Sequence, residues 1–266
     1  MVLFFENRCH NRVVASFAQL HDLTGKVAVV TGGSRGIGRA IAQGLAEAGA
    51  DVVVASRKLE ACQAAAGEIQ ASTGTSPAAI ACHVGRWEDC GRLIEQAIAR
   101  MGRLDVLVNN AGMSPLYSSI HEITEELFDK TIGVNLKGPF RLGALAAAYM
   151  AGHDGGSIIN IGTSGSTMSS VGELPYGCAK AGLNLMTVGL ANAYGPKVRV
   201  NAVLPGPFLT EISKGWATEG DLPYLPLRRM GHPREVAPIV VHLASPASSF
   251  TTGAIIRVDG GVTRHV

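Results

Sequence analysis

Tyr176 and Lys180 lie four residues apart in a stretch, 176–194, that predicts one long helix. Side chains at positions i and i+4 share one face of a helix. A tyrosine phenol, with a pKa of about 10, is a poor base but a competent acid. An ammonium group beside it favours the phenolate, and each unit by which the pKa falls corresponds to about 1.4 kcal/mol. Although the same spacing occurs on ordinary helix surfaces, the pair is suited to proton transfer, for example to a carbonyl oxygen.

A glycine-rich segment could hold phosphate groups. It reads Thr31-Gly32-Gly33-Ser34-Arg35-Gly36-Ile37-Gly38 and lies between Lys26–Val30, which predicts a buried strand, and Arg39–Ala48, which predicts a helix. A turn placed there brings backbone N–H groups and a helix N-terminus against a diphosphate. An ordinary tight turn is the alternative, but the flanking strand and helix are what dinucleotide binding requires. We therefore expect nucleotide contacts from Gly32, Ser34, Arg35, Gly36, Ile37 and Gly38.

The end of the second predicted strand indicates which dinucleotide fits. NAD sites usually place an acidic residue there to hold the ribose hydroxyls. Here the strand Asp51–Ala55 continues into Ser56, Arg57 and Lys58, with no carboxylate. Arg57 can clamp a 2′-phosphate with its planar fork, and Arg35 can add a second cation. Solvated surface arginines are the other interpretation. We expect NADP(H), with contacts from Ser56, Arg57 and Lys58.

The elements that must position these residues alternate along the chain. Strands are predicted at Lys26–Val30, Asp51–Ala55, Ala78–Cys82, Leu104–Val108, Ser157–Ile161, Val198–Val203 and Gly253–Val258. Helices are predicted at Arg39–Ala48, Lys58–Gln70, Glu88–Met101, Thr124–Met150 (interrupted near Gly138–Pro139) and Tyr176–Tyr194. The strands are apolar at successive residues, so both faces of a parallel, doubly wound α/β sheet should be covered by helices. We expect an N-terminal extension over 1–22, one domain over 23–266, and a loop over about 211–232 that covers the substrate.

Composition excludes several classes of protein. Charged residues make up 17% and the net charge is +2, which argues against a nucleic-acid partner. Apolar runs are too short to cross a bilayer, and the first residues do not have the pattern of a signal peptide. The five cysteines and eight histidines have no metal-ligand spacing, so no metal is expected and the thiols suit a reducing compartment. We expect a cytoplasmic protein.

Six motifs together resemble the short-chain dehydrogenase/reductase family over roughly residues 23–261. They are Thr31-Gly32-x-x-x-Gly36-x-Gly38, Asn109-Asn110-Ala111-Gly112, Asn135, Tyr176-x-x-x-Lys180, Pro205-Gly206 and Asp259-Gly260-Gly261. The resemblance implies a single-domain Rossmann-like fold, assembly as a homotetramer or dimer, and catalysis by an Asn–Ser–Tyr–Lys set. It also implies that Lys180 holds the nicotinamide ribose and that Asn135 supports a water chain that resupplies the proton.

The hydroxyl of that catalytic set has two candidates, because the family's usual Asn-Ile-Ser-Ser is here Asn160-Ile161-Gly162-Thr163-Ser164. The family serine usually lies thirteen places before the tyrosine, which selects Thr163. Ser164 matches by residue type but lies one place out of register. Either hydroxyl can donate the hydrogen bond that polarises a carbonyl. We favour Thr163 and keep Ser164 as the alternative.

Further cofactor contacts follow by position in the family. They are expected from His83, Val84, Asn110, Ala111, Gly112, Pro205, Gly206, Phe208 and Thr210, besides Tyr176 and Lys180. At His83 the family commonly has Asp, whose side chain holds the adenine amino group. His83 could stack on the base, bond to it, or face the solvent.

The sequence thus predicts an NADP(H)-dependent oxidoreductase that interconverts a small-molecule carbonyl and alcohol, with Tyr176 as the proton donor. The resemblance implies 3-oxoacyl thioesters, small ketones, sugars or steroids as substrates, and it extends to the 3-oxoacyl-carrier-protein reductase branch of the family. The pocket is expected to include Met113, Ser114, Leu116, Thr163–Ser170, Glu173 and Phe208–Trp216. A non-catalytic redox sensor that binds NADP is the alternative, and the presence of both Tyr176 and Lys180 argues against it.

Overall fold

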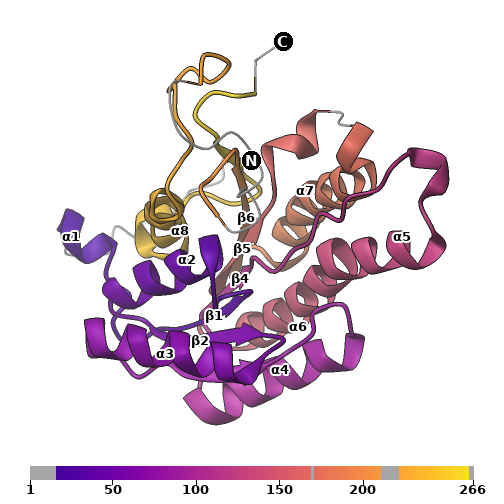
Figure 1. Ribbon diagram of the computed structural model, residues 1–266. Helices are drawn as coiled ribbons and strands as arrows, with labels where there is room; N and C mark the ends of the chain where they lie inside the picture. The colour runs from indigo at the N-terminus through magenta and orange to yellow at the C-terminus, as the bar shows by residue number, and fades with distance from the viewer. Residues whose placement is uncertain (1–15, 169–170, 211–221, 264–266) are drawn as a thin grey trace, which may run out of the picture.

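Seven parallel strands form one sheet in the computed structural model, which describes residues 16–168, 171–210 and 222–263. Their order is β3-β2-β1-β4-β5-β6-β7 (Figure 1). The strands are β1 Val27–Thr31, β2 Asp51–Ser56, β3 Ala78–Ala81, β4 Val106–Asn109, β5 Gly156–Ile161, β6 Val198–Pro205 and β7 Ile255–Val258. Because every strand runs the same way, their carboxyl ends meet at one edge, where ligands bind in such sheets. The predicted doubly wound parallel sheet is confirmed.

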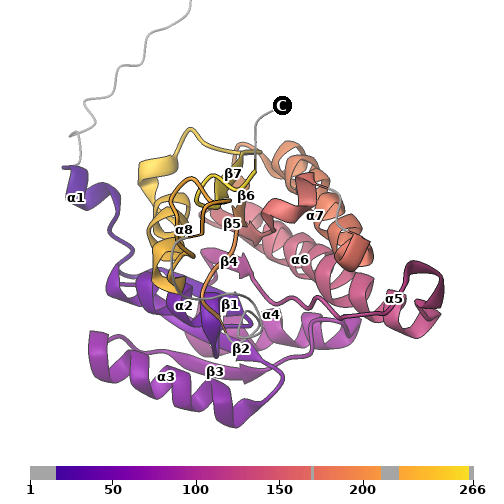
Figure 2. The ribbon, with the colours of Figure 1, turned by 45° about the horizontal axis from the view of Figure 1, so that its top comes forward.

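Helices cover both faces of the sheet (Figures 1 and 2). One face carries α2 Gly36–Glu47, α3 Leu59–Thr73 and α8 Ala237–Ala244. The other carries α4 Trp87–Met101, α6 Gly138–Gly152 and α7 Leu174–Tyr194. The shorter helices are α1 Phe17–Leu20 and α5 Glu125–Ile132. No helix in the described ranges is long and apolar enough to cross a bilayer.

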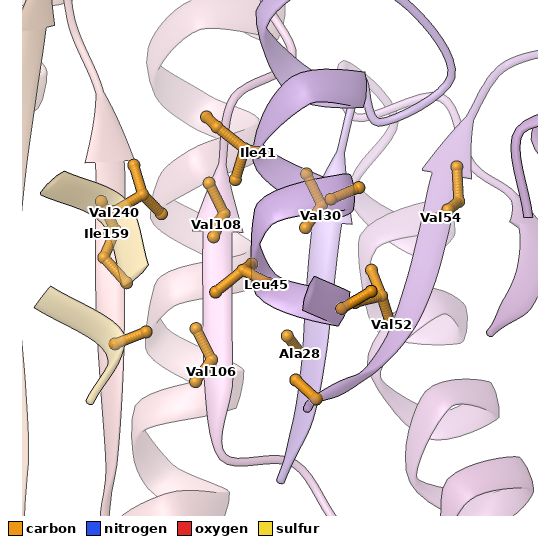
Figure 3. Close-up of a cluster of buried hydrophobic side chains, with 14 of the residues drawn as sticks. Ala28, Val30, Ile41, Leu45, Val52, Val54, Val106, Val108, Ile159 and Val240 are labelled. Carbon is orange, nitrogen blue, oxygen red and sulfur yellow. The ribbon is translucent and has the colours of Figure 1, made fainter. Parts of the chain in front are cut away.

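The core lies on both sides of the sheet because successive strand residues point to opposite faces. Along β1, Ala28 and Val30 pack against Ile41 and Leu45 of α2 (Figure 3). Val27 and Val29, which alternate with them, belong to the cluster beneath α4 and α6. All five residues of β1 are buried, as the unbroken apolar run predicts.

Two helical features differ from the prediction. The break in the predicted helix 124–150 falls at a π-helical turn, Gly133–Lys137, rather than at Pro139. Pro139 lies in the first turn of α6, directly after this π-helical turn. Helix α8 was not predicted at all. It is a short, almost wholly apolar helix, and its sequence shows no polar face that would mark it.

Part of the predicted boundaries falls outside the described residues. This applies to residues 1–15 of the N-terminal extension, to 169–170 and 211–216 of the expected pocket, and to 211–221 of the expected substrate loop. Gly231, in the described part of that loop, forms a single parallel bridge with Phe208, which precedes the loop.

Candidate active site

The glycine-rich segment forms a tight turn between β1 and α2. Gly32 has a φ of +64°, which a residue with a side chain rarely adopts. The Asn110 side chain donates to the carbonyl oxygens of Thr31 at 2.9 Å and Gly32 at 3.3 Å, and so holds the turn against the end of β4. A Cβ atom at Gly38 would lie 2.2 Å from the Gly32 oxygen, so only glycine allows α2 to approach this closely.

The outer side of the same turn is accessible to a phosphate group. Gly36 has a φ of +56°, and the neighbour that an added Cβ would meet is the Thr210 methyl group, 3.9 Å away. Arg35, at the N-cap of α2, makes no side-chain capping bond, so the first-turn amides keep their donors. Exposed backbone donors at the positive end of a helix fit a diphosphate.

The end of β2 carries cations and no acid, as the sequence predicts. Arg57 and Lys58 are exposed, and within the described chain Arg57 makes no ion pair. Ser56 is directed inward: its hydroxyl lies 3.0 Å from the Cys62 thiol. The guanidinium of Arg57 therefore suits a 2′-phosphate, whereas the Ser56 hydroxyl already has a partner.

His83, at the position of the family's Asp, is fixed by its own loop. Its Nδ1 accepts a hydrogen bond of 3.2 Å from the Gly85 amide, and its backbone N–H donates to Asp89. An Nδ1 that accepts leaves Nε2–H as the remaining polar group, and this group is a donor. His83 is half-buried rather than solvent-facing, and it cannot take over the acceptor role of an Asp while this bond persists.

The predicted Tyr176–Lys180 pair is brought together on the first turns of α7. Lys180 is buried, its Nζ donates to the Ile161 oxygen at 2.8 Å, and it lies 5.8 Å from the centre of the Tyr176 ring. An ammonium group carries three donors, so the described chain leaves two of them for a ligand. The end of β5 and the start of α7 thus place both groups at the carboxyl edge of the sheet.

The pKa of the Tyr176 phenol shifts in the opposite direction from the one that the sequence predicts. Burial raises the pKa of Tyr176 to about 12, a hydrogen bond with Thr163 opposes the rise, and the negative charge of Glu173 adds to it. Burial also lowers the pKa of Lys180 to about 8. The largest influence on the phenol is loss of water, which raises its pKa, and the predicted lowering by the Lys180 ammonium is not among the causes of the shift.

Thr163 rather than Ser164 contacts the phenol. The Thr163 side chain hydrogen-bonds with Tyr176 and accepts a second bond, of 3.3 Å, from the Gly165 amide. Ser164 is buried within the short 3-10 helix Ser164–Thr167, and its carbonyl accepts from the Thr167 hydroxyl. This hydrogen bond involves the residue that the family register selects.

Asn135 uses its side chain to fix the loop after β4. Its amide nitrogen donates to the oxygens of Met113 at 2.8 Å and Thr131 at 2.9 Å, and its oxygen accepts from the Met113 amide at 3.1 Å. A Cβ on Gly112 would lie 3.0 Å from this Asn135 oxygen and 3.6 Å from the Lys180 nitrogen. Both donors of the Asn135 amide are thus engaged by backbone, so its side chain has no donor left for a water chain.

Other expected cofactor contacts are placed differently. The amides of Asn110 and Ala111 both donate to the Thr31 hydroxyl, and Gly206 packs against Asp259. Val84 is buried, and its carbonyl accepts from the Cys90 thiol. Four further expected positions are at least half-buried. Phe208 is 5% exposed in the core and Ile37 packs on the same cluster, while Pro205 ends β6 and is buried, and Thr210 is half-buried.

A buried polar chain that the sequence did not reveal sets α7 against the sheet. Asn109 donates to Asn160 at 2.9 Å, and Asn160 donates to the Thr187 hydroxyl at 2.9 Å. These residues come from β4, β5 and α7. Two asparagines at the ends of predicted neighbouring strands were a signal of this contact, but the Thr187 partner could not be recognised.

A small pocket adjoins Tyr176. It is lined by Pro115, Tyr117, Leu127, Thr131, Glu173, Pro175 and Tyr176. The Ser114 hydroxyl donates to Glu173 at 3.1 Å, which joins two residues predicted to shape the substrate pocket. Leu116, also predicted there, is 92% exposed. Among the described residues, no group of three or more His, Cys, Asp or Glu side chains is placed to hold a metal ion.

Comparison with known proteins identifies the family of the chain. Residues 32–263 match a family model described as enoyl-(acyl carrier protein) reductase. Human dehydrogenase/reductase SDR family member 4 is 38% identical over 245 residues, which span 90% of this chain and 88% of the relative.

Two solved structures are similar over nearly their whole length. A blue fluorescent protein from a metagenomic library, in complex with NADPH, has a TM-score of 0.84 and 37% identity, covering 91% of this chain and 100% of the other. A gluconate 5-dehydrogenase from Burkholderia cenocepacia, in complex with NADP and tartrate, has a TM-score of 0.87 and 29% identity, covering 94% and 99%. The chain belongs to the short-chain dehydrogenase/reductase family of oxidoreductases.

Proposed function

We propose that this oxidoreductase interconverts a small-molecule carbonyl and alcohol with NADP(H), and that Tyr176 exchanges the proton with the substrate oxygen. The observation that carries the proposal is the position of Tyr176. Tyr176 lines a shallow hollow, its phenol hydrogen-bonds with Thr163, and its ring centre lies 5.8 Å from the Nζ of the buried Lys180, at the same edge of the sheet as the glycine turn.

The residues present can hold the cofactor, which supplies or accepts the hydride when bound. The turn at Gly36 and the uncapped start of α2 offer donors to the diphosphate. Lys180 keeps two donors for ribose hydroxyls. Arg57 and Arg35 supply cations on the adenosine side, and both solved structures described above contain the phosphorylated dinucleotide.

The protein groups at the reacting end divide the proton chemistry between them. A phenol with a pKa of about 12 stays protonated at neutral pH and can donate to a carbonyl oxygen as that oxygen gains charge. The Thr163 hydroxyl adjoins the phenol and can donate a second hydrogen bond to the same oxygen. The resemblance of the motifs supports ketones or 3-oxoacyl thioesters as substrates, and assembly as a homotetramer or dimer.

An assay of NADPH and NADH oxidation over a panel of ketones tests the proposal. Wild-type protein should oxidise NADPH with at least one ketone, and Tyr176→Phe should lose turnover while still binding NADPH by fluorescence titration. Arg57→Asp should raise the KM for NADPH about tenfold or more relative to NADH, as expected for losing a charge-assisted contact. Lys130→Asp, on the exposed face of α5, is the charge-matched control. NADPH binding without turnover of any ketone would favour a redox sensor instead.

A further inference from the structure

Glu173 and Tyr176 line the same shallow, mainly apolar hollow. Of the pocket's lining residues, Glu173 is the acid, and none is a lysine, arginine or histidine. The walls beside it are mostly apolar, from Pro115, Leu127 and Pro175. Glu173 is half-buried and lies three residues before Tyr176, at the N-cap of α7. A carboxylate in such surroundings is poorly hydrated and favours a partner of opposite charge.

The position of this carboxylate is fixed from several sides. Ser114, on the loop after β4, donates to Oε1 of Glu173 at 3.1 Å. Tyr117 of the same loop donates to the Val171 oxygen and accepts from the Leu174 amide at 2.8 Å, so the loop is tied to the chain on both sides of Glu173. Oε2 points to the neighbouring loop: a Cβ at Gly165 would lie 4.0 Å away.

The charge of Glu173 is not neutralised by the described part of the chain. No lysine, arginine or histidine described in the structure lies within ion-pair distance of Glu173, and its hydrogen-bond partner is the neutral Ser114. Its field nevertheless reaches the reacting group, since it raises the pKa of Tyr176. A substrate whose carbonyl meets Tyr176 therefore places the rest of its skeleton close to an uncompensated negative charge.

We infer that Glu173 determines specificity by binding a protonated amine of the substrate, so that amino ketones are preferred to neutral ketones and anionic ketones are rejected. This inference rests on the proposed function, because the substrate carbonyl must be held at Tyr176. An ammonium group gains charge-assisted hydrogen bonds to Glu173 while its carbon skeleton packs on the apolar walls. A carboxylate or phosphate group in the same place is repelled.

Three ketones of one ring size test the inference: cyclohexanone, tetrahydropyran-4-one and N-methyl-4-piperidone, whose amine is protonated at pH 7. In wild-type protein we expect kcat/KM to be highest for the cationic ketone. Glu173→Gln keeps the side-chain shape and the Ser114 contact, and should lower the ratio of cationic to neutral kcat/KM about tenfold or more. Glu173→Asp, which keeps the charge, should retain part of the preference. Glu126→Gln, which removes a charge from the exposed face of α5, is the matched control and should change nothing.

The outcomes separate this inference from the function on which it rests. An unchanged ratio in Glu173→Gln, with turnover of neutral ketones intact, overturns the inference alone. If no ketone is turned over, the proposed function fails, and calorimetric titration of N-methyl-4-piperidone into the NADPH-saturated protein decides the inference. Binding that weakens about tenfold in Glu173→Gln supports it, whereas equal binding in both proteins, or none in wild type, overturns it.

Discussion

Tyr176 and Lys180 are both shifted toward their neutral forms, and this has a direct bearing on the proposed chemistry. Burial raises the pKa of the phenol to about 12 and lowers that of the ammonium to about 8. A proton donor must carry its proton at the working pH, so the raised value suits carbonyl reduction. The reverse reaction requires the phenolate and should gain rate as the pH rises.

The raised pKa of Tyr176 predicts the outcome of a spectroscopic titration. At pH 10.5 its phenol should remain protonated, so tyrosinate absorbance near 295 nm should be the same in native wild type and native Tyr176→Phe. In denaturant, the titration curves of the two proteins should differ by the absorbance of one tyrosinate, which should appear with a midpoint near pH 10, the pKa of a free tyrosine. A native wild-type curve with an extra phenol ionising between pH 7 and 9 would show that the lysine acidifies Tyr176 after all.

The contact between Thr163 and Tyr176 separates the two candidate hydroxyls. Thr163→Ala should lower kcat by about 100-fold, as loss of one donor to a developing oxyanion commonly does. Thr163→Ser keeps the hydroxyl and should retain most activity. Ser164→Ala should have the smaller effect, because this side chain makes no contact with the phenol among the described interactions. Steady-state kinetics of the three variants provide the measurement, and equal losses at both positions would refute the assignment.

At the scale of the elements, the contact between α2 and the glycine turn leaves no room for an added side-chain atom. A Cβ at Gly38 would lie 2.2 Å from the Gly32 oxygen, and both are backbone positions that cannot move alone. Gly38→Ala should therefore displace α2, weaken NADPH binding by at least tenfold and reduce the free energy of unfolding by about 1–3 kcal/mol.

A second glycine provides the control for that substitution. Gly67 lies in α3, and an added Cβ there would meet nothing within 4 Å. Gly67→Ala should leave NADPH binding unchanged and raise the unfolding free energy by about 0.5–1 kcal/mol through helix propensity. Calorimetric binding and urea unfolding of both variants test the comparison, and equal NADPH affinity for Gly38→Ala and wild type would contradict it.

The elements also show what sequence could and could not predict. Runs such as Asp51–Ala55 identify buried strands because apolar, β-branched residues follow one another, and the observed β2 extends one residue further. Helix α8 escaped prediction because it is apolar on nearly every side. The π turn that carries Asn135 was not predicted either, and the Asn135 side chain there bonds to Met113, 22 positions away along the chain.

The sequence also predicts only part of the candidate site. The pairing of Tyr176 with Lys180, and the position of Thr163 thirteen residues before Tyr176, depend on spacing along the chain and can be read from the sequence. The direction of the Tyr176 pKa shift could not, because it depends on burial by distant segments. Likewise, the bond from Gly85 to His83 Nδ1 reflects a local loop conformation that the residue types do not specify.

For the whole molecule, the amino edge of the sheet carries a charged cluster opposite the proposed site. Asp105, which precedes β4, is 6% exposed and accepts hydrogen bonds from Lys26, from the Val27 amide and from two guanidinium nitrogens of Arg103, Nε and Nη2. Burial alone would raise the pKa of Asp105, but these bonds outweigh it and the net pKa lies below 3.8. The ionised form therefore stabilises the fold.

This cluster predicts a pH-dependent loss of stability. A carboxyl whose pKa is lower in the folded state stabilises fully above its unfolded value, near 3.8, and less as the pH falls through the folded value. At pH 7, Asp105→Asn should lower the free energy of unfolding by about 1.5–3 kcal/mol. That difference should shrink below pH 3.8.

The neighbouring acid Asp154 supplies the comparison. It lies 3.5 Å from Arg103, but its side chain is 82% exposed, so Asp154→Asn should cost less than about 0.5 kcal/mol. Urea unfolding at several pH values measures all three proteins. A deficit of Asp105→Asn that stays constant down to pH 3 would rule out the ionised carboxyl as its cause.

The bond from the Asn110 side chain to the β1 turn has a consequence for how the protein refolds. Donor and acceptor are 79 positions apart along the chain, and they meet only once β4 has docked beside β1. Helices can form within microseconds from local segments, whereas this pairing must wait for a long loop to close. After dilution from denaturant, recovery of dinucleotide affinity should therefore lag behind the return of helical circular dichroism.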